Sequence, residues 1–162
     1  MVSTKGVGSM AQHTITVRPA TPADVDTLTQ FNIAMAHETE EVALDPATVR
    51  SGVDQVLRNT AHGFYLVAEH AGEVVGSLLV TFEWSDWRNG VLWWIQSVYV
   101  ASAWRRNGVL RRLYQVIHAE ATETPEVCGL RLYVEKDNHV AMAAYRHLGM
   151  SQTNYLVYET EF

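Results

Sequence analysis

The sequence has little cysteine and no long apolar run. Cys128 is the single cysteine among 162 residues, so no disulfide can form within the chain. Because Cys128 precedes the strand-like stretch 129–132, we expect a small buried apolar side chain rather than a nucleophile. No apolar run reaches the length of a membrane span, and residues 1–8 lack the apolar centre of a signal peptide. These features predict a cytoplasmic protein with no membrane partner.

The chain also lacks an excess of positive charge. It has 12 Lys and Arg against 18 Asp and Glu, a formal net charge of −6. Nucleic-acid binding needs a positive field, so we expect no nucleic-acid partner. The acidic balance favours a cationic small molecule or a basic peptide instead. No metal site is predicted.

No repeat, linker or low-complexity tract interrupts the chain, and its length suits one domain with a substantial core. We expect a single domain over residues 10–162. Residues 1–9 are interpreted as an N-terminal extension or as residues introduced by cloning, with Met10 as an alternative start.

Hydrophobic periodicity predicts the element order β-α-α-β-β-β-α-β-α-β. This order indicates an α/β fold with a mixed, mostly antiparallel central sheet and helices on both faces. Helices are expected to begin near residues 21, 45, 108 and 138. Strands are expected over residues 14–18, 64–69, 74–84, 91–100, 130–134 and 155–162.

Two stretches carry a chemical signal. In the first, the strand 97–100 runs through a basic turn, 105–108, into a helix. Such a turn gathers unpaired backbone amides around an anion, and arginines beside the positive helix end are unfavourable by ~0.3–1 kcal/mol each until an anion binds. The second begins at Asn138, a helix cap, carries Tyr145 on one face of the helix and ends at 148–150.

With these two motifs in their places, the chain resembles the GNAT N-acetyltransferase superfamily over nearly its whole length. The superfamily's signature loop is Arg or Gln, two residues, Gly, one residue, then Gly or Ala. Arg105 and Gly108 match it, whereas Leu110 stands where the small residue is usual. Asn138 and Tyr145 match the second signature.

The resemblance implies a GNAT fold and acetyl-coenzyme A (acetyl-CoA) as the cofactor. In the superfamily the strand pairs with the pantetheine arm through its backbone, and the loop and helix start hold the diphosphate. The capping Asn is expected to hydrogen-bond the pantetheine as well. The cofactor-binding residues implied in this chain are Val98, Tyr99, Val100, Arg105, Arg106, Asn107, Gly108, Val109, Leu110, Arg111 and Asn138.

Acetyl transfer to an amine needs a neutral nucleophile, stabilisation of an oxyanion and a proton for the departing thiolate. A lysine-like amine with a pKa near ~10.4 is mostly protonated at pH 7, so a group must accept its proton. Glu83, at the end of its strand, is the first candidate for this base. Asp86, His37 and His118 are alternatives. A backbone N–H near 98–99 would stabilise the oxyanion.

Tyr145 is the general acid that the resemblance implies, although its helical spacing alone would make it a core aromatic. Proton transfer from a phenol with a pKa near ~10 to a thiolate near ~8.5 is uphill by roughly 2 kcal/mol. We therefore expect Tyr145 to donate a hydrogen bond in the transition state. Full transfer would need a lowered pKa.

The segment 37–41 and the stretch 83–87 combine carboxylates with aromatic side chains, which suits a cationic amine. The predicted substrate-binding residues are Glu38, Glu41, Trp84 and Asp86. A solvated acidic loop with core tryptophans is the alternative. Trp93 and Trp94 point to opposite faces of one strand, so at least one belongs to the core.

The predicted function is acetyl-CoA-dependent transfer of an acetyl group, by direct attack, to the primary amine of a small cationic acceptor. Two alternatives stay open. The acceptor could be the N-terminus or a lysine of a protein, or the chain could be a non-catalytic acyl-CoA-binding module. A homodimer is possible.

Overall fold

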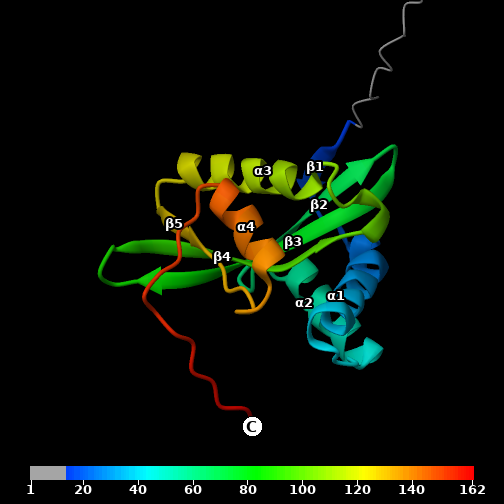
Figure 1. The fold of residues 1–162 in the computed structure, drawn as a ribbon, viewed down its shortest axis with the longest axis horizontal. Coiled ribbons are helices and arrows are strands. Elements are labelled where there is room, and N and C mark those ends of the chain that lie inside the picture. Colours follow the sequence, from blue (N-terminus) through cyan, green and yellow to red (C-terminus); the bar gives the residue numbers. More distant parts are fainter. Residues whose placement is uncertain (1–13) are drawn as a thin grey trace, which may run out of the picture. The chain divides into compact units, whose positions relative to one another are not determined.

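The computed structural model describes residues 14–162 (Figure 1). The expectations for residues 1–9 and for Met10 therefore lie outside the described residues. The described chain forms two compact units that divide after Arg131, and each is described by itself.

The first unit contains a five-stranded sheet in the order β1-β2-β3-β4-β5. Neighbours from β1 to β4 pair antiparallel, and β5 pairs parallel to β4. This mixed, mostly antiparallel sheet confirms the predicted class. The strands are β1 (Thr16–Pro19), β2 (Phe64–His70), β3 (Glu73–Ser85), β4 (Gly90–Val100) and β5 (Val127–Arg131).

Three helices of this unit follow the predicted starts: α1 (Val25–Glu40), α2 (Pro46–Arg58) and α3 (Val109–Glu123). A short 3-10 turn, Pro22–Asp24, leads into α1. The start of α2 has the local chemistry expected from the sequence, because the Asp45 carboxylate accepts a hydrogen bond from Thr48 N at 2.8 Å and Pro46 takes the first helical position.

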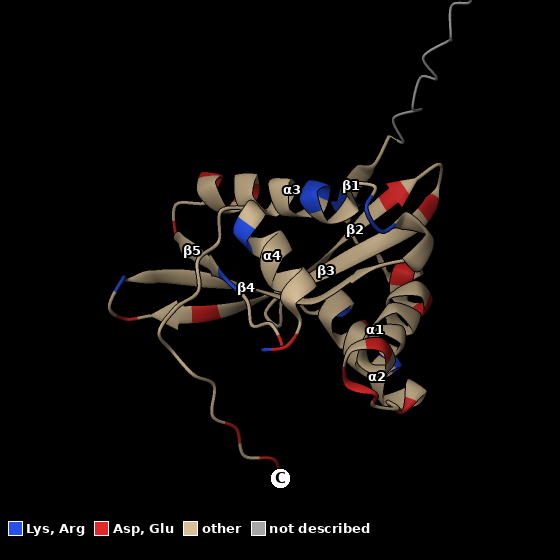
Figure 2. Ribbon diagram, viewed as in Figure 1, with Lys and Arg blue, Asp and Glu red and all other residues tan. Residues whose placement is uncertain are grey.

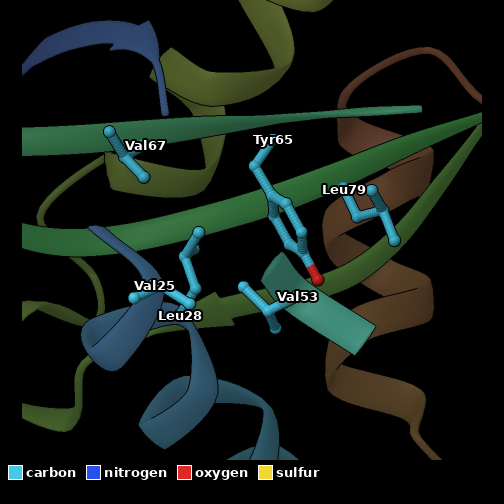
Figure 3. Close-up of a cluster of buried hydrophobic side chains, with 6 residues drawn as sticks. All are labelled: Val25, Leu28, Val53, Tyr65, Val67 and Leu79. Atoms are coloured by element: carbon cyan, nitrogen blue, oxygen red, sulfur yellow. The ribbon is translucent and has the colours of Figure 1, made fainter. Parts of the chain in front are cut away.

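Helices α1 and α2 cover one face of the sheet, and α3 covers the other (Figure 1). On the first face, one buried cluster joins both helices to strands β2 and β3 (Figure 3). Its members are Val25, Leu28, Val53, Tyr65, Val67 and Leu79. On the second face, Val109, Leu113 and Ile117 of α3 are fully buried or nearly so. Gly76 of β3 lets α3 pack closely on this face, since a Cβ at this position would lie 2.8 Å from Val109 Cγ1.

A buried carboxylate ties β1 to the start of α1. Asp24 accepts hydrogen bonds from Arg18 Nη1 and Nη2 at 2.8 and 3.0 Å, and from Thr21 N at 2.7 Å. Arg18 Nε also donates to Glu69 at 2.8 Å. The hydrogen bond from Arg18 holds the pKa of Asp24 below its usual range.

We expect Asp24→Asn to lower the free energy of unfolding by about 1–2 kcal/mol at pH 7, because charge-assisted hydrogen bonds are lost. A depressed pKa contributes stability above the unfolded-state value of about 3.9, and that stability is lost as the pH falls through the folded-state pKa. The variant should therefore lose less stability than the wild type below about pH 4. Urea unfolding over this range measures the difference. Asp26→Asn, which removes an exposed carboxylate near the start of α1 that pairs with the exposed Arg50, is the control; an equal effect of both variants would contradict the role of Asp24.

The second unit contains α4 (His139–His147), which begins where the sequence predicts. The expected closing strand over 155–162 is wrong, because this segment has no regular secondary structure and pairs with no described strand. Its large side chains are exposed, Tyr155 and Tyr158 among them. The aromatic and branched residues at 155–158 suit a strand, but a strand also needs a paired neighbour.

Two further expectations are corrected at β5. This strand spans Val127–Arg131 instead of 130–134, and Cys128 is exposed rather than buried. The pairing register runs from Val91↔Val127 to Leu92↔Gly129, which leaves Cys128 as the extra residue of a bulge. A bulge interrupts the alternation of buried and exposed side chains, and the sequence pattern does not reveal it.

Candidate active site

A bulge in strand β4, just before the basic turn, shifts which of its side chains point to each face of the sheet. The pairing with β3 passes from Leu79↔Gln96 to Ser77↔Tyr99, so β4 has one residue more than β3 here. Ser97 adopts φ +47°, which fits such an irregularity. The bulge turns Tyr99 toward α1, where its ring centroid lies 4.9 Å from that of Phe31.

The same part of β4 has an open edge within the first unit. Pairing with β5 ends at Trp94↔Arg131, and no strand among residues 14–131 pairs with the following part of β4 on that side. Val98, Tyr99 and Val100, which the resemblance assigns to pantetheine binding, lie in this part. An extended ligand can hydrogen-bond a free strand edge.

The turn into α3 presents several backbone amides together. Arg106 and Gly108 both have positive φ, +66° and +79°. The first helical hydrogen bond is donated by Arg112 N to Gly108 O at 2.9 Å. Among the described residues, the N–H groups from Gly108 to Arg111 therefore have no backbone acceptor, as at any helix start. Together with the helix dipole, they form an anion-binding concavity.

Arginine residues lie in this turn and in the first turn of α3 (Figure 2). Arg106, Arg111 and Arg112 are exposed, and none forms an ion pair with a residue in 14–162. These three carry the positive charge that the sequence predicts at the turn. Asn107 lies among them, and its side chain donates to Arg105 O at 3.2 Å.

Arg105 differs from the other arginines because it has partners. Its Nε donates to Val100 O at 3.0 Å, and its Nη2 pairs with the Glu38 carboxylate at the end of α1. The Tyr99 hydroxyl donates to the other Glu38 oxygen at 2.9 Å. The hydrogen bond from Arg105 lowers the pKa of Glu38. Arg105, which is predicted to bind the cofactor, and Glu38, which is predicted to bind the amine substrate, therefore form an ion pair with each other.

Glu83 lies on the sheet face that α1 and α2 cover, in a group of three side chains. Its Oε1 lies 3.1 Å from Arg131 Nη1, and Trp94 Nε1 donates to its Oε2. The Arg131 Cζ lies 5.9 Å from the centroid of the Trp94 ring. A carboxylate held by these donors is well oriented.

The helix α4 of the second unit carries Asn138 and Tyr145. The Asn138 side chain accepts a hydrogen bond from Ala141 N at 3.0 Å, so it caps the helix as expected. Tyr145 is partly buried, and burial raises the pKa of its phenol. The phenol is therefore protonated at neutral pH and can donate a hydrogen bond.

A cleft of about 420 Å³ lies along α1 and the segment that follows it. It is lined by Gln30, Ile33, Ala34, His37, Glu38, Val42, Ala43 and Leu44. Glu38 is the only carboxylate in this lining. Glu41 follows α1 as an exposed residue with φ +56°.

The other two predicted acceptor residues lie on the β3–β4 hairpin. Trp84 is 61% exposed and pairs with Val91 in the sheet, one position beyond Glu83. Its side chain therefore points to the α3 face, away from the face of Glu38. Asp86 accepts a hydrogen bond from Trp87 N at 2.9 Å in the turn. The structure does not place Trp84 beside Glu38, and the acceptor roles stay predictions.

The roles of three residues in this region were not predicted from the sequence. Arg131 and Trp94 hold Glu83, and Ser97 forms the bulge. The sequence analysis placed Trp93 and Trp94 on opposite faces of their strand, but the approach of Arg131 to Glu83 depends on the parallel register of β5 with β4. No sequence signal marks Ser97.

Comparison with known proteins identifies the family. The profile of the acetyltransferase (GNAT) family matches residues 30–150. A possible acetyltransferase from Clostridium difficile 630 has 40% identity and a TM-score of 0.86, over 91% of this chain and 97% of that one. The chain belongs to the GNAT acetyltransferase family.

Two more distant structures share the fold. A ribosomal-protein-alanine N-acetyltransferase from Brucella melitensis biovar Abortus 2308 has 15% identity and a TM-score of 0.73, over 92% of this chain and 99% of that one. AAC(6')-Iy, in complex with the bisubstrate analogue CoA-S-monomethyl-acetylneamine, has 11% identity and a TM-score of 0.73 over the same shares. A search among curated protein sequences found no match.

As a GNAT acetyltransferase, the protein uses acetyl-CoA as its cosubstrate. The described residues fit this group, because the amides of Gly108–Arg111 lack acceptors and three unpaired arginines adjoin them. These residues would hold the diphosphate. The open edge of β4 would hold the pantetheine arm. Within residues 14–162, no helix has both the length and the apolar character needed to cross a bilayer.

Proposed function

We propose that this acetyltransferase acts on the primary amine of a small cationic acceptor. The observation that carries the proposal is the cleft along α1, which contains the Glu38 carboxylate and lies in the same unit as the diphosphate turn. A carboxylate in a largely apolar cleft favours an ammonium group on an apolar frame. The acidic residues Glu40 and Glu41, next along the chain, add to the negative field (Figure 2).

The chemical roles follow from the groups at hand. Bound acetyl-CoA supplies an activated acetyl thioester. Glu83 accepts a proton from the ammonium of the acceptor, directly or through water, and the neutral amine then attacks the thioester carbon. The N–H of the 98–99 region stabilises negative charge on the thioester oxygen. Tyr145 donates a hydrogen bond to the departing sulfur. We also propose that residues 10–162 act as one N-acetyltransferase domain, since the family profile extends across parts of both units.

A thiol-release assay with a broad amine panel tests this proposal. The panel contains linear diamines and polyamines, amino sugars, amino-acid amides, and peptides with a free N-terminus or a single lysine. We expect the small polycations to give the highest kcat/KM. Preference for peptides would support a protein acceptor. Binding of CoA without turnover of any amine would favour a non-catalytic module and overturn the proposal.

Gly108→Val tests the diphosphate turn. Its φ of +79° is strained for any residue with a side chain, whereas a Cβ there meets no atom within 4 Å, so the new side chain would crowd only a ligand. We expect acetyl-CoA affinity to fall by at least about ten-fold, or about 1.4 kcal/mol, in calorimetry.

Gly72→Val is a matched control for this variant. Gly72 has φ +84°, also with open space around its Cβ, but lies in the β2–β3 turn. Both variants should lose similar stability, and Gly72→Val should keep its acetyl-CoA affinity. Equal affinity of both variants would place the diphosphate elsewhere.

A further inference from the structure

The pair of Arg105 and Glu38 links the two sides of the site. Glu38 is the only carboxylate among the residues that line the α1 cleft, and Arg105 neutralises it. The cleft therefore offers a cation little net charge in this state. Arg105 in turn occupies the Val100 carbonyl, which lies on the strand assigned to pantetheine binding.

The pair can come apart at low cost. The Arg105 and Glu38 side chains are 47% and 39% exposed, so water screens their attraction. Arg105 stands three positions before Gly108, in the turn that carries the other arginines. A diphosphate bound at this turn brings two or more negative charges and attracts the guanidinium more strongly than one carboxylate does.

From this geometry we propose that Glu38 exchanges partners during binding. The donor diphosphate takes over Arg105, and the freed Glu38 carboxylate then pairs with the ammonium of the acceptor in the α1 cleft. This inference rests on the proposed function. It makes Glu38 a positioning residue that favours binding of acetyl-CoA before a cationic amine, because the two occupants act on one ion pair.

The exchange predicts that removing the Glu38 charge strengthens CoA binding. In the free protein Glu38 competes with the diphosphate for Arg105, so Glu38→Gln should bind CoA about two- to five-fold tighter, the range of an exposed ion pair. If Glu38 only supported the fold of the turn, its loss would weaken CoA binding instead. Calorimetry with CoA measures the sign directly.

Glu40→Gln is the matched control, because it removes the same charge from the last residue of α1 without breaking the pair. Any gain in CoA affinity that both variants share reflects the loss of one negative charge near the site rather than the loss of the ion pair. The excess gain of Glu38→Gln should shrink when the salt is raised from about 0.01 M to about 1 M, since the screening length falls from about 30 to about 3 Å.

A double-mutant cycle isolates the pair. In an Arg105→Gln background, Glu38→Gln should give no gain beyond that of Glu40→Gln. With a cationic amine from the panel, Glu38→Gln should raise the KM of the amine while it lowers the Kd of CoA. Unchanged or weaker CoA binding by Glu38→Gln overturns the exchange and leaves the proposed function intact. Failure of the wild type to bind CoA would overturn the proposed function itself.

Discussion

Replacing Glu83 by Gln should lower kcat/KM about 10²- to 10⁴-fold at pH 7, the usual contribution of a positioned base. The amide retains an oxygen that can accept from Trp94 and Arg131, so the local fold should persist. It cannot take a proton from the ammonium of the acceptor to give the neutral amine that attacks. Steady-state kinetics with an amine from the panel measures the loss.

The pH profile separates proton transfer from mere orientation. A lysine-like amine has a pKa near ~10.4, so its neutral fraction rises about ten-fold per unit between pH 7 and 9. The rate of Glu83→Gln should follow this rise, whereas the wild type should gain less because its base removes the proton. A parallel loss at every pH would indicate a role in orientation alone.

The ion pair with Arg131 offers a matched variant. Arg131→Gln leaves the carboxylate of Glu83 in place and removes its ion pair. It should retain most of the activity, because the carboxylate that accepts the proton remains. If Glu83→Gln keeps full activity, the base is another group, with Asp86 the next candidate.

Local chemistry explains which parts of the fold could be predicted. Asp45 and Asn138 cap their helices with side chains read directly from the sequence. The face of Glu83 is set by local alternation, since the irregularity of β3 at Val75 lies far from it and Leu79 to Ser85 pair with β4 without a shift. These features depend on a few neighbouring residues, and the sequence contains them in full.

Features that depend on pairing between distant segments were not accessible in this way. The bulges at Ser97 and Cys128 arise from the register between strands, so the exposure of Cys128 was predicted wrongly. The segment 155–162 begins with a run of apolar residues that suits a strand, but it has no paired neighbour among the described strands. The partner of Arg105 is 67 residues away in sequence, and no motif links it to Glu38.

Changing Tyr145 to Phe should lower kcat by at least about ten-fold with little change in acetyl-CoA affinity, because the interaction is made mainly in the transition state. Burial raises the pKa of the Tyr145 phenol, which makes complete proton transfer to a thiolate near ~8.5 still less favourable than for an exposed tyrosine. Tyr145 should therefore stabilise the departing sulfur by a hydrogen bond. Unchanged kcat would exclude it from the chemistry.

The raised pKa also fixes the expected pH dependence. A phenol that ionises above ~10 stays protonated across the neutral range, so no alkaline fall of kcat below about pH 10 should be traceable to Tyr145. A fall there that Tyr145→Phe abolished would show a phenol with a lowered pKa acting as a true acid. Tyr158→Phe is the control, since that side chain is 91% exposed in the same unit and should leave kcat unchanged. The hydrogen-bond role thus requires that Tyr145→Phe lowers kcat strongly and Tyr158→Phe does not. Any alkaline fall of kcat seen in the wild type should also be seen in Tyr145→Phe.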